Sequence, residues 1–136
     1  MATVCVVLRR AMNADQARPY FSHPSQLKCG LDPNDLHDNG IEYRARHGVC
    51  LAFHQSFWPT VWMVHIGVIP SAWGKADAPC KELLGEFLVE KNAERVIAWI
   101  PESNRACQAL AERIGFQIDG VLPLESGHIT MNGWRA

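Results

Sequence analysis

The chain has 136 residues, of which 48% are hydrophobic and 20% are charged, and its formal net charge is −1 at pH 7. This length suits a single domain, residues 1–136, with a core of its own. The balanced charge argues against nucleic-acid binding, because contacts to phosphates dominate affinity for nucleic acids. No apolar run is long enough for a transmembrane helix, so no membrane association is expected.

Cysteine and histidine are scattered through the sequence, with five and six copies. No two cysteines form a C-x-x-C pair, and no two histidines have the helical spacing of metal ligands. Neither a disulfide framework nor a metal site is therefore expected. The apolar start of the chain is followed by basic residues instead of preceded by them, which is the wrong polarity for a secretory signal. We expect a cytoplasmic protein.

In chain order, residues 3–8 are β-rich and are predicted to form the first strand. Asn13 or Asp15 can cap a short helix that ends at His23–Pro24, and a further turn can follow before the polar loop LDPNDLHDNG. Three strands are then predicted, with tight turns between them, as an antiparallel meander over residues 41–46, 49–57 and 61–69.

The stretch VIPSAWGKADAP follows the third of these strands and opens a helix that Asn92 is predicted to end. The next strand covers residues 95–100, and Ser103 or Asn104 can cap a second helix that ends at Gly115. Its inward face is predicted to carry Ala106, Leu110 and Ile114. Two closing strands are predicted over residues 116–118 and 128–134. The alternation of elements predicts an α/β chain with a mixed sheet, whose strand–helix–strand unit is a right-handed parallel crossover.

The loop before the first long helix has two interpretations. Anions bind well at a helix N-terminus, the small residues Gly74, Ala76 and Ala78 allow close approach to the backbone, and Lys75 adds positive charge. However, the carboxylate of Asp77 can satisfy the same N–H groups and repel a phosphate. The loop alone leaves an anion site and a turn capped by Asp77 both open.

The stretch RVIAWIPESNRACQALAERIGF resembles a motif of GNAT-type N-acetyltransferases, in which a strand leads to an Asn, a helix of small and apolar residues, and a closing Gly-Phe. The stretch HIGVIP and the following Trp-Gly-Lys-Ala resemble the preceding strand and loop of that superfamily. The resemblance covers residues 61–120 well, and the compact form is similar to small GNAT-like proteins of tailed phages. It implies a GNAT-like fold, with a mixed sheet of about six to seven strands flanked by about four helices.

This resemblance implies an N-acetyltransferase that transfers an acetyl group from acetyl-CoA to an amine. The backbone of Ile66 and Val68 would pair with the pantetheine arm between two parallel strands, and Asn104 would lie near the same arm. Backbone N–H groups of the loop would hold the pyrophosphate, and they belong to Trp73, Gly74, Lys75, Ala76, Asp77 and Ala78. His65 lies where relatives carry a carboxylate or a His, and is the candidate general base because an imidazole of near-neutral pKa suits that task.

Three residues depart from the family pattern. Trp73 replaces an Arg or Gln, Ala76 replaces a Gly where positive φ is expected, and Ala111 replaces a Tyr that protonates the leaving thiolate. These departures motivate an alternative, a weak or inactive GNAT-fold module with a structural or host-interaction role in a phage. Plainer roles also stay open: His65 as a half-buried strand residue and Asn104 as an N-cap. Trp58 and Trp134 are candidates for an interface between copies of the chain or with a phage or host protein.

Overall fold

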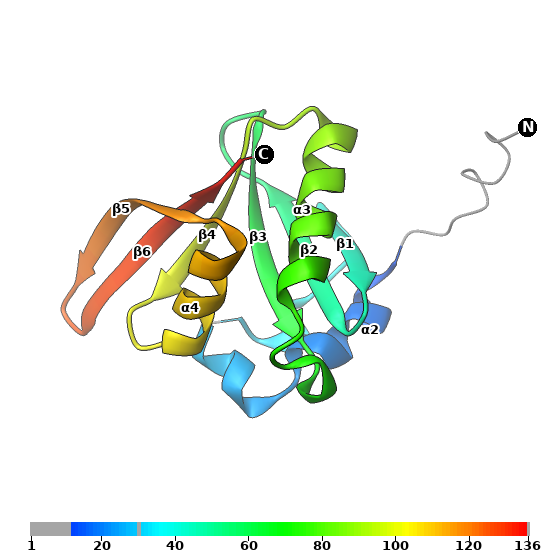
Figure 1. Cartoon of the computed structure of the whole chain (residues 1–136), viewed down its shortest axis with the longest axis horizontal. Helices are drawn as coiled ribbons and strands as arrows, with labels where there is room; N and C mark the ends of the chain where they lie inside the picture. Colours follow the sequence, from blue (N-terminus) through cyan, green and yellow to red (C-terminus); the bar gives the residue numbers. More distant parts are fainter. Residues whose placement is uncertain (1–11, 30, 136) are drawn as a thin grey trace, which may run out of the picture.

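The computed structural model describes residues 12–29 and 31–135, so the predicted first strand over residues 3–8 lies outside the described residues. Six strands form one sheet in the order β1-β2-β3-β4-β6-β5 (Figure 1). The strands are β1 (Ile41–Arg46), β2 (Val49–Gln55), β3 (Val61–Val68), β4 (Arg95–Pro101), β5 (Gln117–Leu124) and β6 (Gly127–Trp134). All neighbouring strands are antiparallel except β3 and β4, which are parallel. The sheet is therefore mixed, as predicted.

Helices cover the two faces of the sheet unequally (Figure 1). The long helices α3 (Asp77–Lys91) and α4 (Arg105–Ile114) lie on one face, which we call the helix face. The other face, which we call the N-terminal face, is covered by α2 (Ala14–Ala17) beside β1, by the 3₁₀ turn η1 (Arg18–Phe21) beside β3 and by the 3₁₀ turn η2 (Pro24–Cys29) beside β4. Two further 3₁₀ turns, η3 (Pro33–Asp35) and η4 (Pro70–Ala72), lie in loops.

The side chains of β2 are divided between these two layers. Leu51 and Phe53 join the helix-face core, where the Phe53 ring stacks on Phe87 of α3 at 3.7 Å between ring centroids. Cys50 and Ala52 point to the N-terminal face and pack in the second core. This alternation is the period of a strand that is buried on both sides, and it fixes which β3 residues reach which face.

Most predicted helix ends are confirmed. Asn13 forms a capping box with Gln16, and Asn92 and Gly115 end α3 and α4 in the left-handed conformation, with φ of 51° and 102°. The prediction that Ala106 faces inward is wrong, because its side chain is exposed. Leu110 and Ile114 face inward as predicted, and Cys107 and Ala111 complete the inward face of α4.

The C-terminal hairpin differs from its prediction in length and position. β5 is longer than the predicted strand and continues to Leu124, and β6 lies between β4 and β5. Pro123 belongs to this strand because β5 is at the edge of the sheet, where a missing N–H is tolerated. Trp134 is buried and donates its indole N–H to the Ile114 carbonyl at 2.8 Å, so its predicted place at an interface is wrong. Trp58 is exposed.

Gly67 of β3 allows the N-terminal segment to lie directly on the sheet. A Cβ at this position would be 2.7 Å from the Tyr20 carbonyl oxygen and 2.9 Å from the Phe21 ring. Neither the backbone of η1 nor a ring that is 1% exposed can move away freely. The absence of a side chain at Gly67 therefore sets the position of Phe21 on the N-terminal face.

We predict that Gly67→Ala lowers the free energy of unfolding by about 1–3 kcal/mol, because the added methyl overpacks this contact. Gly85→Ala is the matched control, since a Cβ there meets no atom within 4 Å and alanine favours the interior of α3 by up to about 1 kcal/mol. Denaturant unfolding measures both variants. Equal effects of the two substitutions would contradict the close approach at Gly67.

Candidate functional site

The parallel strands β3 and β4 part in the middle of the sheet. Their pairing comprises Val61–Arg95, Trp62–Val96 and Met63–Ile97, and it stops there although both described strands continue. The other edge of β4 stays paired with β6 as far as Pro101, and the other edge of β3 stays paired with β2 as far as Val68. β3 stays hydrogen-bonded to β2 and β4 stays hydrogen-bonded to β6, so an opening forms between β3 and β4.

Backbone groups of Ile66 and Val68 face this opening. The Ile69 N–H donates to the Gly48 carbonyl at 3.0 Å and the Val61 carbonyl accepts from Ser56 at 3.1 Å, so the odd-numbered residues of β3 turn their polar groups toward β2. Successive residues of a strand alternate in this direction, and Ile66 and Val68 therefore turn theirs toward β4. One of these groups has a partner, because the Val68 carbonyl accepts from the Trp73 indole N–H at 3.3 Å.

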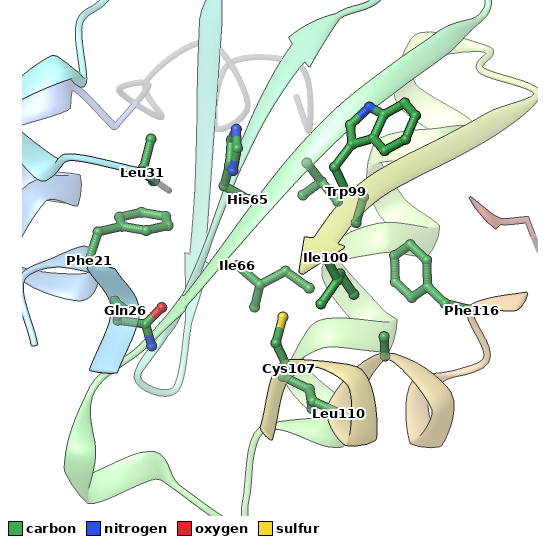
Figure 2. A pocket seen from close by; sticks show the side chains of 13 residues that line it. Phe21, Gln26, Leu31, His65, Ile66, Trp99, Ile100, Cys107, Leu110 and Phe116 are labelled. Carbon is green, nitrogen blue, oxygen red and sulfur yellow. The ribbon is translucent and has the colours of Figure 1, made fainter. Parts of the chain in front are cut away.

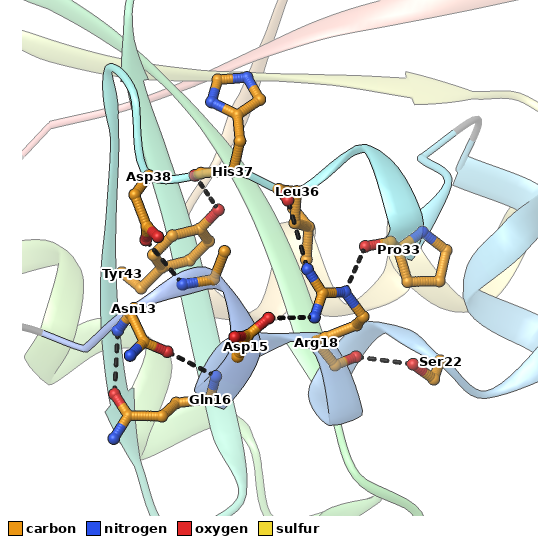
Figure 3. A network of polar contacts seen from close by, with 11 residues as sticks. Asn13, Asp15, Gln16, Arg18, Ser22, Pro33, Leu36, His37, Asp38 and Tyr43 are labelled. Atoms are coloured by element: carbon orange, nitrogen blue, oxygen red, sulfur yellow. Dashed lines mark hydrogen bonds and ion pairs between the residues drawn. The ribbon is translucent and has the colours of Figure 1, made fainter.

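A cavity of about 30 Å³ lies in the opening and connects its two sides (Figure 2). This volume holds about two water molecules and so admits a small group rather than a long chain. From the helix side it is lined by Val64, Ile66, Ala98, Ile100, Cys107, Leu110, Ala111 and Phe116. From the N-terminal face it is lined by Phe21, Gln26, Leu31, His65 and Trp99.

His65 points to the N-terminal face and stacks on His54 of β2, with 5.5 Å between ring centroids. This pair follows from the register, in which Ala52 lies opposite His65 and His54 is therefore its diagonal neighbour. Burial, together with the neighbouring His54 ring, lowers the pKa of His65 to about 4. The expectation of an imidazole with a near-neutral pKa is thus wrong: the ring is uncharged at neutral pH and is a weak base.

The loop between β3 and α3 carries unpaired N–H groups. The N–H groups of Ala72, Trp73 and Lys75 donate to Ile69, Pro70 and Ala72. Within the part of the chain that the structure describes, five other N–H groups of this loop and first helical turn have no protein acceptor, and they belong to Ser71, Gly74, Ala76, Asp77 and Ala78. The last four of these donors lie at the N-terminus of a 15-residue helix, which is a favourable place for an anion.

Two expectations about this loop are wrong. Ala76 has φ of −84°, and its methyl group is buried in the core, so its replacement of glycine causes no strain. The residue with positive φ is Gly74, at 81°, and a Cβ there would meet no atom within 4 Å. Asp77 does not cap α3, because its carboxylate accepts from Arg113 Nε of α4 at 3.1 Å. The interpretation as a turn capped by Asp77 is therefore excluded.

Some of the other predicted site residues line the cavity, and others lie beyond it. Ile66 and His65 line it, and the loop with Trp73 and the exposed Lys75 follows the end of β3. Asn104 is buried at the start of α4, where its side-chain oxygen accepts the Cys107 N–H at 3.2 Å. Its role as an N-cap is confirmed.

Several lining residues were not predicted from the sequence. Phe21, Gln26 and Leu31 come from the N-terminal segment, and only the packing of that segment on Gly67 brings it to the cavity. Trp99 and Cys107 could have been predicted from the sequence. Strand alternation on β4 places Trp99 at the opening, and helical spacing from Ala111 places Cys107 there.

Residues 12–29 and 31–135 contain no group of three or more His, Cys, Asp or Glu side chains that could hold a metal ion. None of the helices in these ranges combines the length and the apolar character that crossing a membrane requires.

No protein-family model matches the sequence, and no curated protein sequence matches it significantly. Solved structures do match the fold. A GNAT-family acetyltransferase from Bacillus anthracis aligns over 63% of this chain and 57% of its own, with 17% identity and a TM-score of 0.56. A dodecameric spermidine N-acetyltransferase from Vibrio cholerae aligns over 71% of this chain and 66% of its own, with 15% identity and a TM-score of 0.58.

An aminoglycoside acetyltransferase in complex with coenzyme A aligns over 92% of both chains, with 11% identity and a TM-score of 0.67. This chain spans less than two thirds of the length of the Bacillus and Vibrio proteins. At these identities the likeness establishes the fold, which is that of the GNAT acetyltransferases.

The buried His65 predicts a loss of stability in acid. Above pH 6.5 the ring is neutral in the folded and unfolded states, so it contributes nothing there. As pH falls from 6.5 to about 4, the unfolded chain binds a proton that the folded chain does not, and the free energy of unfolding falls. Between pH 6.5 and about 4, we expect the free energy of unfolding of His65→Gln to fall by up to about 3 kcal/mol less than that of the wild type. Denaturant unfolding at a series of pH values measures this difference. An acid dependence identical to the wild type would contradict a buried neutral His65.

Proposed function

We propose that this protein is an acetyl-CoA-dependent N-acetyltransferase with an amine acceptor. The observation that carries the proposal is the parting of β3 and β4, with backbone groups of Ile66 and Val68 turned toward the opening and a cavity of about 30 Å³ within it. An amide-bearing arm can pair with such groups, and a small acyl group fits the cavity. The coenzyme A complex of an acetyltransferase with the same fold supports this choice of substrate.

The residues present fit the two ends of acetyl-CoA. The Val68 N–H and the polar groups of Ile66 are available to the pantetheine amides, while the Val68 carbonyl is already bonded to Trp73. Phosphates would bind the free N–H groups between Gly74 and Ala78, with Lys75 as a nearby positive charge. Asp77 opposes this less than its sequence position suggests, because its carboxylate is paired with Arg113 of α4. Asn104 would contribute through its place at the start of α4.

His65 is the proposed proton acceptor. Acetyl-CoA supplies the activated acyl group, and a strand N–H near Val68 would polarise its carbonyl as the amine adds. Because the pKa of His65 is about 4, its ring is free to accept a proton at neutral pH but is too weak to deprotonate an ammonium group efficiently. The acceptor therefore has to enter as a free amine. Ala111 offers no acid to the leaving thiolate, so that proton comes from solvent.

Two observations favour the alternative, a GNAT-fold module without turnover. The Trp73 indole holds the Val68 carbonyl that the pantetheine arm would use, and Ala111 leaves the cavity without a proton donor at that position. Such a module would act by contact with another protein, in a phage particle or with a host protein, or with further copies of itself. The exposed Trp58 is the candidate contact residue. Both functions would be performed in the cytoplasm.

Calorimetry with acetyl-CoA distinguishes these functions. We expect binding by the wild type and about tenfold weaker binding by Lys75→Glu, because the substitution replaces attraction to phosphate by repulsion. Lys81→Glu, an equally exposed charge reversal further along α3, is the control and should keep its affinity. Absence of binding at millimolar acetyl-CoA would refute the enzyme and favour the module.

The role of His65 as proton acceptor is tested by measuring the release of coenzyme A from acetyl-CoA in the presence of an amine. His65→Gln should bind acetyl-CoA normally and turn over about 10²-fold more slowly, which is the usual effect of losing a general base. Unchanged turnover would remove His65 from the mechanism.

A further inference from the structure

The described residues that line the cavity carry no formal charge. Of the 13 described residues that line it, none is acidic and none is Lys or Arg, and the one titratable imidazole, His65, is neutral at neutral pH. On the N-terminal face, where His65 points, the lining is aromatic or aliphatic apart from His65 and Gln26. Figure 2 shows the His65 ring between Phe21 on one side and Trp99 on the other.

The N-terminal segment that covers the cavity contains no carboxylate, and the carboxylates on neighbouring elements already have partners. Residues 18–31, which include η1 and η2, contain no Asp or Glu in their sequence. Asp32, the next residue, accepts the Asn34 N–H at 2.9 Å. On the β4 side, Asp119 is paired with Arg95, and Glu102 is paired with His128 at 2.8 Å. Asp119 and Glu102 are therefore already paired, and no described residue of the lining carries a carboxylate that could offset a positive charge.

An ammonium group that enters such a site loses its hydration without gaining a counter-charge, which costs several kcal/mol. An uncharged amine avoids that cost. Its N–H groups can donate to the neutral His65 ring or to the Gln26 side chain, and an attached aromatic ring can contact Phe21 and Trp99, which is 40% exposed. The site thus favours an amine of low basicity that carries an apolar group.

We infer that the amine acceptor is an apolar, weakly basic amine of the aryl amine type, and not a polycationic amine. The geometry that carries this inference is the uncharged lining formed by Phe21, Leu31 and Trp99 around His65. The inference rests on the proposed acetyltransferase function and names its acceptor class.

The test compares 4-methoxyaniline with spermidine as acceptors for the wild-type protein and acetyl-CoA near neutral pH. We expect kcat/KM for the aryl amine to exceed that for spermidine by about 100-fold, since spermidine must bury or lose a charge. Binding of each amine to the protein is measured separately by saturation-transfer NMR, which needs no turnover. A preference for spermidine in either measurement would overturn the inference.

Leu31→Glu sharpens the test by placing a carboxylate in the lining, and Leu31→Gln is the uncharged variant of the same size. We expect Leu31→Glu alone to shift the preference toward spermidine by about tenfold. Leu122→Glu adds the same charge on β5, away from the lining, and should leave the preference unchanged. An equal shift for Leu31→Glu and Leu122→Glu would overturn the role of the lining.

The two proposals fail differently. If acetyl-CoA does not bind, the acetyltransferase function fails, and the NMR comparison still decides whether the cavity prefers the aryl amine. If acetyl-CoA binds and spermidine is the better acceptor, only the inference about the acceptor fails.

Discussion

The loss of pairing between β3 and β4 after Met63 and Ile97 is the constraint on which the rest of the site depends. Both strands keep full antiparallel ladders on their outer sides, so the divergence costs hydrogen bonds only at the opening. Cys107, Leu110 and Ala111 of α4 close the opening from the helix face, and Phe21 closes it from the N-terminal face. The result is a short exposed stretch of backbone in the middle of an otherwise well-paired sheet, which a ligand with amide groups can complete.

The position of the opening also explains the chemistry of His65. His65 lies beside the opening and is buried by the elements that close the opening. His54 is its diagonal neighbour because β2 and β3 stay in register. Burial favours the neutral ring, which makes His65 a constantly available but weak proton acceptor. The same apolar surroundings that lower its pKa would also exclude a charged acceptor. For the proposed acetyltransferase, the weakly basic ring and the uncharged lining therefore favour one class of amine acceptor.

Local signals in the sequence predicted much of this structure. The caps at Asn13 and Asn104, the left-handed ends at Asn92 and Gly115, and the meander from β1 to β3 depend on neighbouring residues and were predicted correctly. The order of β4, β6 and β5 depends on long-range pairing and was not predicted. Likewise, the ion pair between Asp77 and Arg113 joins two helices, so the sequence near Asp77 suggested a cap that does not exist. The inward face of α4 was misjudged at Ala106 because helical spacing alone leaves its rotation uncertain by one residue.

Amide hydrogen exchange followed by NMR, with and without coenzyme A, tests the central claim most directly. Ile66 and Val68 have N–H groups that face the opening, and the N–H groups of Gly74, Ala76, Asp77 and Ala78 have no protein acceptor within the described chain. We expect saturating coenzyme A to slow amide exchange at both places, while exchange of the paired amides of β2 stays unchanged. Saturation of the protein with no added protection at Ile66, Val68 and the loop would contradict this expectation.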